Sequence, residues 1–141
     1  MKLSRRSAVH SLLSVVACVV LVVHPSFAQD GSPPGDEFLK LLDGRQYAES
    51  WGVSSDFFKR SVSQKDWVVQ VQQLREPLGA VVTRRQKSSE PQKNPPGAPQ
   101  GDYLLQTYET KFSNSEPART ETLPLIKADD GRWRAIGYFV R

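Results

Sequence analysis

The hydrophobic pattern of this chain changes at Gly79, from a helical repeat before it to a strand repeat after it. Before Gly79, apolar residues recur every three or four positions at Trp67, Val71, Leu74 and Leu78, which is typical of one helix face. After Gly79 the apolar residues lie in short runs that alternate with polar ones, and proline and glycine separate the runs. A chain that places helices first and strands afterwards is expected to fold as an α+β domain.

Two or three helices are predicted before Gly79. The first begins with Asp36 as a capping residue and ends at Asp43-Gly44. The second begins near Arg45 and has Gly52 as a weak point. Its apolar face consists of Tyr47, Trp51, Phe58 and Val62. The third follows a capping box at residues 63–66.

Four antiparallel strands are predicted after Gly79, over residues 80–86, 102–112, 119–127 and 132–141. The many prolines between Ser88 and Gly101 favour a long exposed loop. Residues 113–117 form a turn, and Pro124 indicates a sheet edge or a bulge. Asp130-Gly131 is a hairpin turn signal, so the last strand is continuous and pairs with the one before it. The prediction is therefore two or three helices packed on a curved four-stranded antiparallel sheet.

The first 28 residues read as an export signal. Lys2, Arg5 and Arg6 precede an apolar run over residues 12–23, and Ser26-Phe-Ala28 places small residues before a cleavage site after Ala28. The apolar run is too short to span a bilayer, which needs about 20 residues. Residues 29–35 then form a short tether, and residues 36–141 form one domain. The protein is thus expected in the periplasm or outside the cell.

A second interpretation of the leader remains open. Val15-Val-Ala-Cys18 is similar to a bacterial lipobox, which would make Cys18 a lipidated N-terminus. The apolar run, however, continues after this cysteine through Val23, whereas a lipoprotein signal places it before the cysteine. Membrane attachment is expected only if Cys18 is lipidated.

Removing the leader changes what chemistry the chain can perform. The only cysteine, Cys18, and both histidines, His10 and His24, lie in it. The remaining domain therefore lacks the side chains of the usual zinc sites, of Cys–His or Ser–His–Asp catalysis, and of a disulfide. Sixteen basic and 15 acidic side chains remain, so the charge near +1 gives no support for a nucleic-acid partner. We expect no metal and no cofactor.

Spaced aromatic residues and glycines also carry a resemblance to a known family. They are Tyr47-Ala-Glu-Ser-Trp51, Phe57-Phe58, Trp67, Arg75-Glu-Pro-Leu-Gly79, Arg84, the Pro-Gly-Ala-Pro stretch at 96–99, Gly101-Asp-Tyr103, Glu121-Thr122, Asp130-Gly-Arg-Trp133 and Gly137-Tyr-Phe139. In this order they resemble the bacterial family called domain of unknown function 4019. The resemblance implies a small exported or envelope protein and names no catalytic residue. The element order also resembles the cone-shaped nuclear-transport-factor-2-like and cystatin-like folds.

Candidate site residues follow from this fold. If the sheet and helices enclose a ligand pocket, its wall is expected to contain Trp51, Arg75, Arg84, Tyr108 and Tyr138. A competing interpretation pairs Arg75 with a carboxylate such as Asp43 or Glu121, which would join helix to sheet. Trp133 is expected to share an aromatic core with Trp51 and Trp67.

Three functions remain open from the sequence. The first is an exported, non-catalytic domain that binds a partner or belongs to an envelope assembly. The second is a divergent cone-fold enzyme that uses Asp, Glu or Tyr as acid and base, which requires a carboxylate buried in a real pocket. The third is a lipid-anchored envelope protein.

Overall fold

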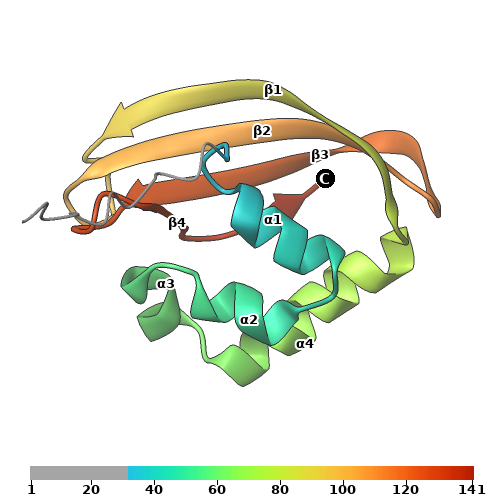
Figure 1. Cartoon of the computed structure of the whole chain (residues 1–141), viewed down its shortest axis with the longest axis horizontal. Helices are drawn as coiled ribbons and strands as arrows, with labels where there is room; N and C mark the ends of the chain where they lie inside the picture. Colours follow the sequence, from blue (N-terminus) through green and yellow to red (C-terminus); the bar gives the residue numbers. More distant parts are fainter. Residues whose placement is uncertain (1–31) are drawn as a thin grey trace, which may run out of the picture.

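The computed structural model describes residues 32–141 and has two layers, a curved antiparallel sheet and a group of helices on its concave side (Figure 1). The chain runs in order through α1 (Asp36–Asp43), α2 (Tyr47–Gly52), α3 (Asp56–Ser61), α4 (Gln64–Arg75), a 3-10 turn (Glu76–Leu78), β1 (Val81–Lys93), β2 (Asp102–Phe112), β3 (Ser115–Lys127), β4 (Trp133–Ala135) and β5 (Phe139–Val140). The predicted α+β class is confirmed. The sheet order is β1-β2-β3-β4, and β5 also pairs with β3. The export signal, Ala28 and Cys18 lie outside the described residues.

Local sequence signals explain where the helices begin. Ser63 caps α4, because its hydroxyl accepts a hydrogen bond from the Asp66 backbone N–H at 3.1 Å, as the capping box predicts. The cap of α1 differs from the prediction. Gly35, in the left-handed conformation, precedes the helix, and Asp36 is its first residue. Asp36 instead pairs with Lys40 one turn later, at 2.7 Å.

The predicted second helix is in fact two helices, so four α-helices precede the sheet within residues 32–141. α2 ends at Gly52, and Ser55 then caps α3 by accepting a hydrogen bond from Phe58 N at 3.1 Å. The Ser55 backbone N–H donates to the Ala135 carbonyl at 2.9 Å. This bond to β4 holds the break between the two helices against the sheet.

The predicted loop from Ser88 to Gly101 is wrong over its first half. β1 continues to Lys93 and includes Pro91, which lies opposite Leu104 of β2. β1 pairs only with β2 in the described sheet, so it is an edge strand, where a proline without an N–H is tolerated. The remaining connection is short, and Asn94 closes it by accepting a hydrogen bond from Gly101 N at 2.8 Å.

The predicted last strand is interrupted between β4 and β5. Pro124 of β3 lies at the interruption, where its carbonyl accepts a hydrogen bond from Ile136 N at 3.0 Å. In an extended strand the N–H and the carbonyl of one residue point to the same neighbouring strand. Proline has no N–H, so at Pro124 the missing hydrogen bond falls on the side of β4 and β5 and not on the side of β2. β3 is therefore a central strand with a gap in one ladder, rather than a sheet edge. In a continuous strand Ala135 and Tyr138, three residues apart, would lie on opposite faces. Because the strand is interrupted between them, both are buried.

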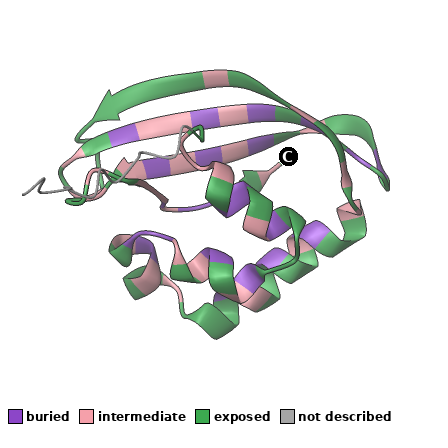
Figure 2. Ribbon diagram, viewed as in Figure 1, coloured by how far each residue is buried: buried purple, intermediate pink, exposed green. Residues whose placement is uncertain are grey.

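The core lies between the helices and the concave face of the sheet. Buried residues alternate along β2 and β3 and form a stripe on each long helix (Figure 2). Trp67 is at the centre of the aromatic contacts, with ring centroids 5.1 Å from Phe58 and 6.0 Å from Phe38. Trp51 and Trp133 pack against this core but are only partly buried, so the expected shared core of three tryptophans has one at its centre and two at its margin. Within residues 32–141, no helix has the length and apolar character needed to cross a membrane.

Candidate functional site

The most concentrated chemistry in the described chain is a group of charged and hydroxyl side chains between the helices and the sheet, buried at Glu121 and exposed at Asp43. We call it the ion-pair network, and its members are Asp43, Arg75, Arg84, Thr110, Glu121 and Tyr138. Glu121, on β3, is at its centre and has no exposed surface. A carboxylate at this depth is tolerated only with charged partners and hydrogen bonds.

Glu121 accepts five hydrogen bonds from four residues. Arg75 donates to Oε1 at 3.0 Å, and Arg84 donates to Oε2 at 2.6 Å and to Oε1 at 3.0 Å. The hydroxyls of Thr110 and Tyr138 donate to Oε2 and Oε1 respectively. Both carboxylate oxygens are thereby engaged.

Asp43, at the end of α1, completes the network from the helical side. Its Oδ1 accepts from Arg75 at 2.7 Å and from Arg84 at 2.9 Å, and its Oδ2 accepts from Arg84 at 2.7 Å. Each arginine therefore bridges the same two carboxylates. Because Arg75 ends α4, and Arg84, Thr110 and Glu121 lie on β1, β2 and β3, the network joins two helices to three strands.

The network is electrically balanced, with two guanidinium groups and two carboxylates. Burial by itself would lower the pKa of Arg75, but the interactions with Tyr138, Asp43 and Glu121 outweigh burial and raise it. Burial opposes the charge of Arg84 as well, and its bonds to Asp43 and Glu121 raise the pKa of that side chain far above the ordinary value. Burial, followed by the nearby Glu121 charge, raises the pKa of Tyr138 well above that of free tyrosine.

The polar atoms of the network are almost all used inside the protein. Tyr138 accepts a hydrogen bond from Arg75 at 2.7 Å and donates one to Glu121. The guanidinium of Arg75 also stacks over Phe112, with its carbon 4.9 Å from the ring centroid. Arg75 Nε is the one buried side-chain nitrogen or oxygen that lacks a partner within residues 32–141. Glu121 thus offers no exposed carboxylate oxygen to a substrate, whereas the Asp43 side chain is 31% exposed.

The structure brings together three of the five residues predicted to line a pocket. Arg75, Arg84 and Tyr138 meet in the ion-pair network, and the pairing of Arg75 with both Asp43 and Glu121 is present. Tyr108 is buried elsewhere and donates its hydroxyl to Gln106 at 2.9 Å. Trp51 lies among the helices and donates its indole N–H to the Val62 carbonyl at 2.9 Å. That these five residues bind a ligand stays a prediction, and none of them lines either of the two surface hollows described for the chain.

Of the two adjacent carboxylates before Gly131, Asp130 acts on the backbone. Asp130 accepts a hydrogen bond from Arg132 N at 3.0 Å and one from the Arg134 side chain at 2.6 Å. The backbone bond from Arg132, and then the Arg134 side chain, lower the pKa of this exposed carboxyl. Asp130 therefore stabilises the turn before β4, as aspartate commonly does in turns.

A comparison with protein-family models shows which family this chain belongs to. The model described as "Protein of unknown function (DUF4019)" matches residues 35–138, which is most of the chain. The chain belongs to the DUF4019 family. Among curated proteins, no relative matches it.

Much of the network of this DUF4019 domain comes from the residues that carried the family resemblance. Arg75, Arg84, Glu121 and Tyr138 all lie in those stretches, which cover α4, β1, β3 and the segment before β5. Asp43 lies outside them and is contributed by α1. Four of the six network residues therefore lie in the stretches that carry the resemblance.

Thr110 is the network residue that the sequence analysis missed. Its backbone lies opposite Arg84 on β1, and its hydroxyl reaches Glu121 on the neighbouring strand β3. The alternation of β2 places Thr110 on the same face as Tyr108 and Phe112, both of which are buried. This pattern is visible in the sequence and marks Thr110 as a buried polar residue in need of a partner.

Proposed function

We propose that this DUF4019 domain is exported and acts by binding, through its surface, a partner or ligand outside the cytoplasm. The leader supports export, because a basic segment, a short apolar run and a small-residue cleavage site occur in the expected order. The two-layer fold, with its interior filled by aromatic and aliphatic side chains, supports a rigid scaffold.

The observation that carries this proposal is the saturation of the ion-pair network. An acid-base enzyme needs a carboxylate that reaches substrate, with a pKa suited to proton transfer. Glu121 is fully buried, and both of its oxygens accept hydrogen bonds from cations and hydroxyls of the protein itself. The arrangement suits a structural role, in which helices and sheet are held in one relative position.

Replacing Glu121 by glutamine tests this structural role against a catalytic one. Glu121→Gln leaves one buried and one half-buried arginine with a single carboxylate, so the free energy of unfolding should fall by about 3–5 kcal/mol. A catalytic residue behaves in the opposite way, since removing it commonly leaves stability unchanged or increases it. Chemical denaturation followed by circular dichroism gives the measurement.

Glu90→Gln is the matched control for this experiment. Glu90 is an exposed carboxylate on the edge strand β1, and no ion pair is described for it. Its replacement should leave the denaturation midpoint unchanged. Equal stability of Glu121→Gln and the parent protein would overturn the structural role and favour the acid-base alternative.

The mass of the processed N-terminus tests export and separates it from lipid anchoring. Cleavage after Ala28 gives a protein that begins at Gln29 and is soluble after osmotic release of the periplasm. An acylated N-terminal Cys18 would show the lipid-anchored alternative instead. Recovery of the full-length chain in the cytoplasm would contradict both.

A further inference from the structure

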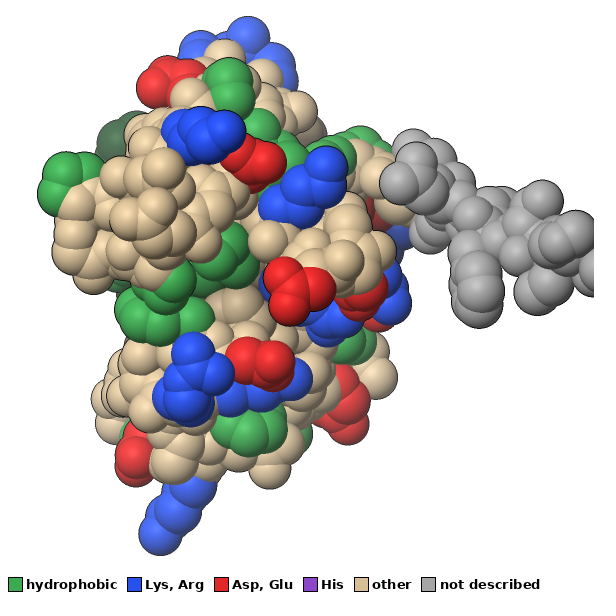
Figure 3. All heavy atoms as spheres, turned by 90° about the vertical axis from the view of Figure 1, so that its left-hand side faces the viewer, with side chains coloured by type: hydrophobic (Ala, Val, Ile, Leu, Met, Phe, Trp, Pro, Cys, Tyr) green, Lys and Arg blue, Asp and Glu red, His purple; other side chains and the backbone are tan. Residues whose placement is uncertain are grey.

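A hollow of about 350 Å³ lies at the end of the sheet where β1 and β3 end and β2 and β4 begin. We infer that it binds a small ligand in which a carboxylate is joined to an aromatic or branched apolar group. Figure 3 looks onto this end of the molecule, where apolar side chains gather between the sheet and the helices and charged side chains lie around them. This inference rests on the proposal that the domain acts by binding, and it names a ligand class.

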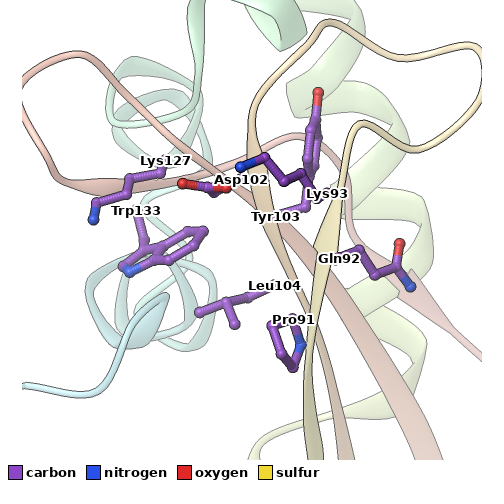
Figure 4. A pocket seen from close by; sticks show the side chains of 8 residues that line it. All are labelled: Pro91, Gln92, Lys93, Asp102, Tyr103, Leu104, Lys127 and Trp133. Atoms are coloured by element: carbon purple, nitrogen blue, oxygen red, sulfur yellow. The ribbon is translucent and has the colours of Figure 1, made fainter.

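Three apolar side chains from three strands form the wall of the hollow. They are Pro91 of β1, Leu104 of β2 and Trp133 of β4. In Figure 4 the indole of Trp133 and the side chain of Leu104 lie on facing sides, whereas Gln92 and Tyr103 extend away from Trp133. A wall with one aromatic plane and aliphatic neighbours suits a flat apolar group.

Trp133 differs from the other two tryptophans in the hydrogen bonding of its indole N–H. The indole N–H groups of Trp51 and Trp67 donate to Val62 O at 2.9 Å and to Ser50 Oγ at 3.0 Å. No hydrogen bond of the Trp133 indole occurs among residues 32–141, and the side chain is only partly buried. In Figure 4 the indole nitrogen lies on the ring edge turned away from Leu104 and Pro91, so this N–H is a donor available to a ligand at the rim of the hollow.

The charges at the rim favour an anion. Lys127 lies over the Trp133 ring, with Nζ 5.9 Å from the centroid, and Lys93 lies opposite Asp102 in the β1–β2 ladder. In the described part of the chain, neither lysine is within ion-pair distance of a carboxylate. With Asp102 included, the rim carries one net positive charge. Asp102 repels an anion, so the carboxylate of the ligand is expected beside Lys127 and the Trp133 N–H.

The size of the hollow limits the ligand. A water molecule occupies about 30 Å³ in the liquid, so the hollow of about 350 Å³ has room for a group of about twelve non-hydrogen atoms. 3-Phenylpropionate has this size, a single carboxylate and an aromatic ring. Its amide, 3-phenylpropionamide, has nearly the same shape and no charge.

Titration of the protein with these two compounds tests the inference. The protein is expressed with its native N-terminus, and the tryptophan indole N–H signals are followed by nuclear magnetic resonance. The Trp133→Phe variant assigns the third signal. With 3-phenylpropionate, the Trp133 signal should shift to saturation, while those of Trp51 and Trp67 stay in place. The amide should bind about tenfold more weakly, since it lacks the charge-assisted contact.

Two lysine variants locate the anion. Lys127→Gln should weaken 3-phenylpropionate binding about tenfold, for the same reason as the amide. Lys65→Gln, an exposed lysine on α4, should leave it unchanged. Absence of a saturable shift at Trp133, equal binding of acid and amide, or equal effects of the two lysine variants would overturn the inference.

The outcome is separable from that of the proposed function. If Glu121→Gln destabilises the protein as expected and 3-phenylpropionate does not bind, the ligand class is wrong and the binding scaffold stands. If Glu121→Gln leaves stability intact, the proposed structural role fails whatever the titration shows.

Discussion

At the scale of single residues, the central fact is that Glu121 is charged, buried and fully engaged. Two arginines neutralise it, and two hydroxyls complete its hydrogen bonds. The partners of Arg75 could be predicted from the sequence, because a buried arginine requires carboxylates and few of them lie on inward faces. The role of Arg84 could not, since its direction depends on the pairing of β1 with β2. Its adjacent residue Arg85 points outward and pairs with Glu109.

The tyrosines give a prediction about pH. All four, Tyr47, Tyr103, Tyr108 and Tyr138, have pKa values raised above 10.0, and burial is the largest cause in each. The folded protein therefore holds these protons more tightly than the unfolded chain does. The stability from this source is complete below about pH 10 and is lost as the pH rises above it.

Absorbance at 295 nm measures this effect directly. At pH 10 the native protein should show much less tyrosinate than the same protein in denaturant, where the four side chains titrate as free tyrosine. Unfolding should accompany their ionisation at higher pH. Identical titration curves for the native and denatured protein would show that the tyrosines are accessible to solvent.

At the scale of elements, the junction between α4 and β1 decides how the helices meet the sheet. Gly79 lies in it with φ +80°, and a β-carbon there would come within 2.2 Å of Ser113 Oγ. The change of hydrophobic period at this residue could be read from the sequence. The lengths of the strands could not, because whether a proline ends a strand depends on its position in the sheet. Pro91 is tolerated at the edge, and Pro124 interrupts only one ladder.

Replacing Gly79 by alanine tests the junction. Gly79→Ala combines an unfavourable backbone conformation with a collision at the β2–β3 turn, and we expect a loss of about 2–4 kcal/mol in the free energy of unfolding. Gly97→Ala is the control, because Gly97 has a similar φ of +78° and no atom within 4 Å of the added carbon. It should cost about 1–2 kcal/mol, from the backbone alone. Equal losses in the two variants would mean that the junction relaxes without cost.

At the scale of the whole molecule, the ion-pair network is a buried polar connection between the two layers, besides the bond from Ser55 to Ala135. Its charged groups are Asp43 and Arg75 from the helices and Arg84 and Glu121 from the sheet. Arg75 pairs with Glu121 and Arg84 with Asp43 across the layers, so ion pairs join the layers as well as the apolar core. The α+β class and the order of elements follow from hydrophobic period alone. The closure of the network cannot be predicted in this way, since it requires six separate segments of the chain to converge.

A double-mutant cycle tests whether the network acts as one balanced unit. Glu121→Gln leaves an excess positive charge and Arg84→Met an excess negative one, whereas the double variant retains Arg75 and Asp43 as a balanced pair. The free energies of unfolding of the parent, the two single variants and the double variant are measured by chemical denaturation. The network predicts that the double variant loses about 1–3 kcal/mol less than the sum of the single losses. Losses that add to within about 0.5 kcal/mol would contradict it, and would show that these side chains contribute independently.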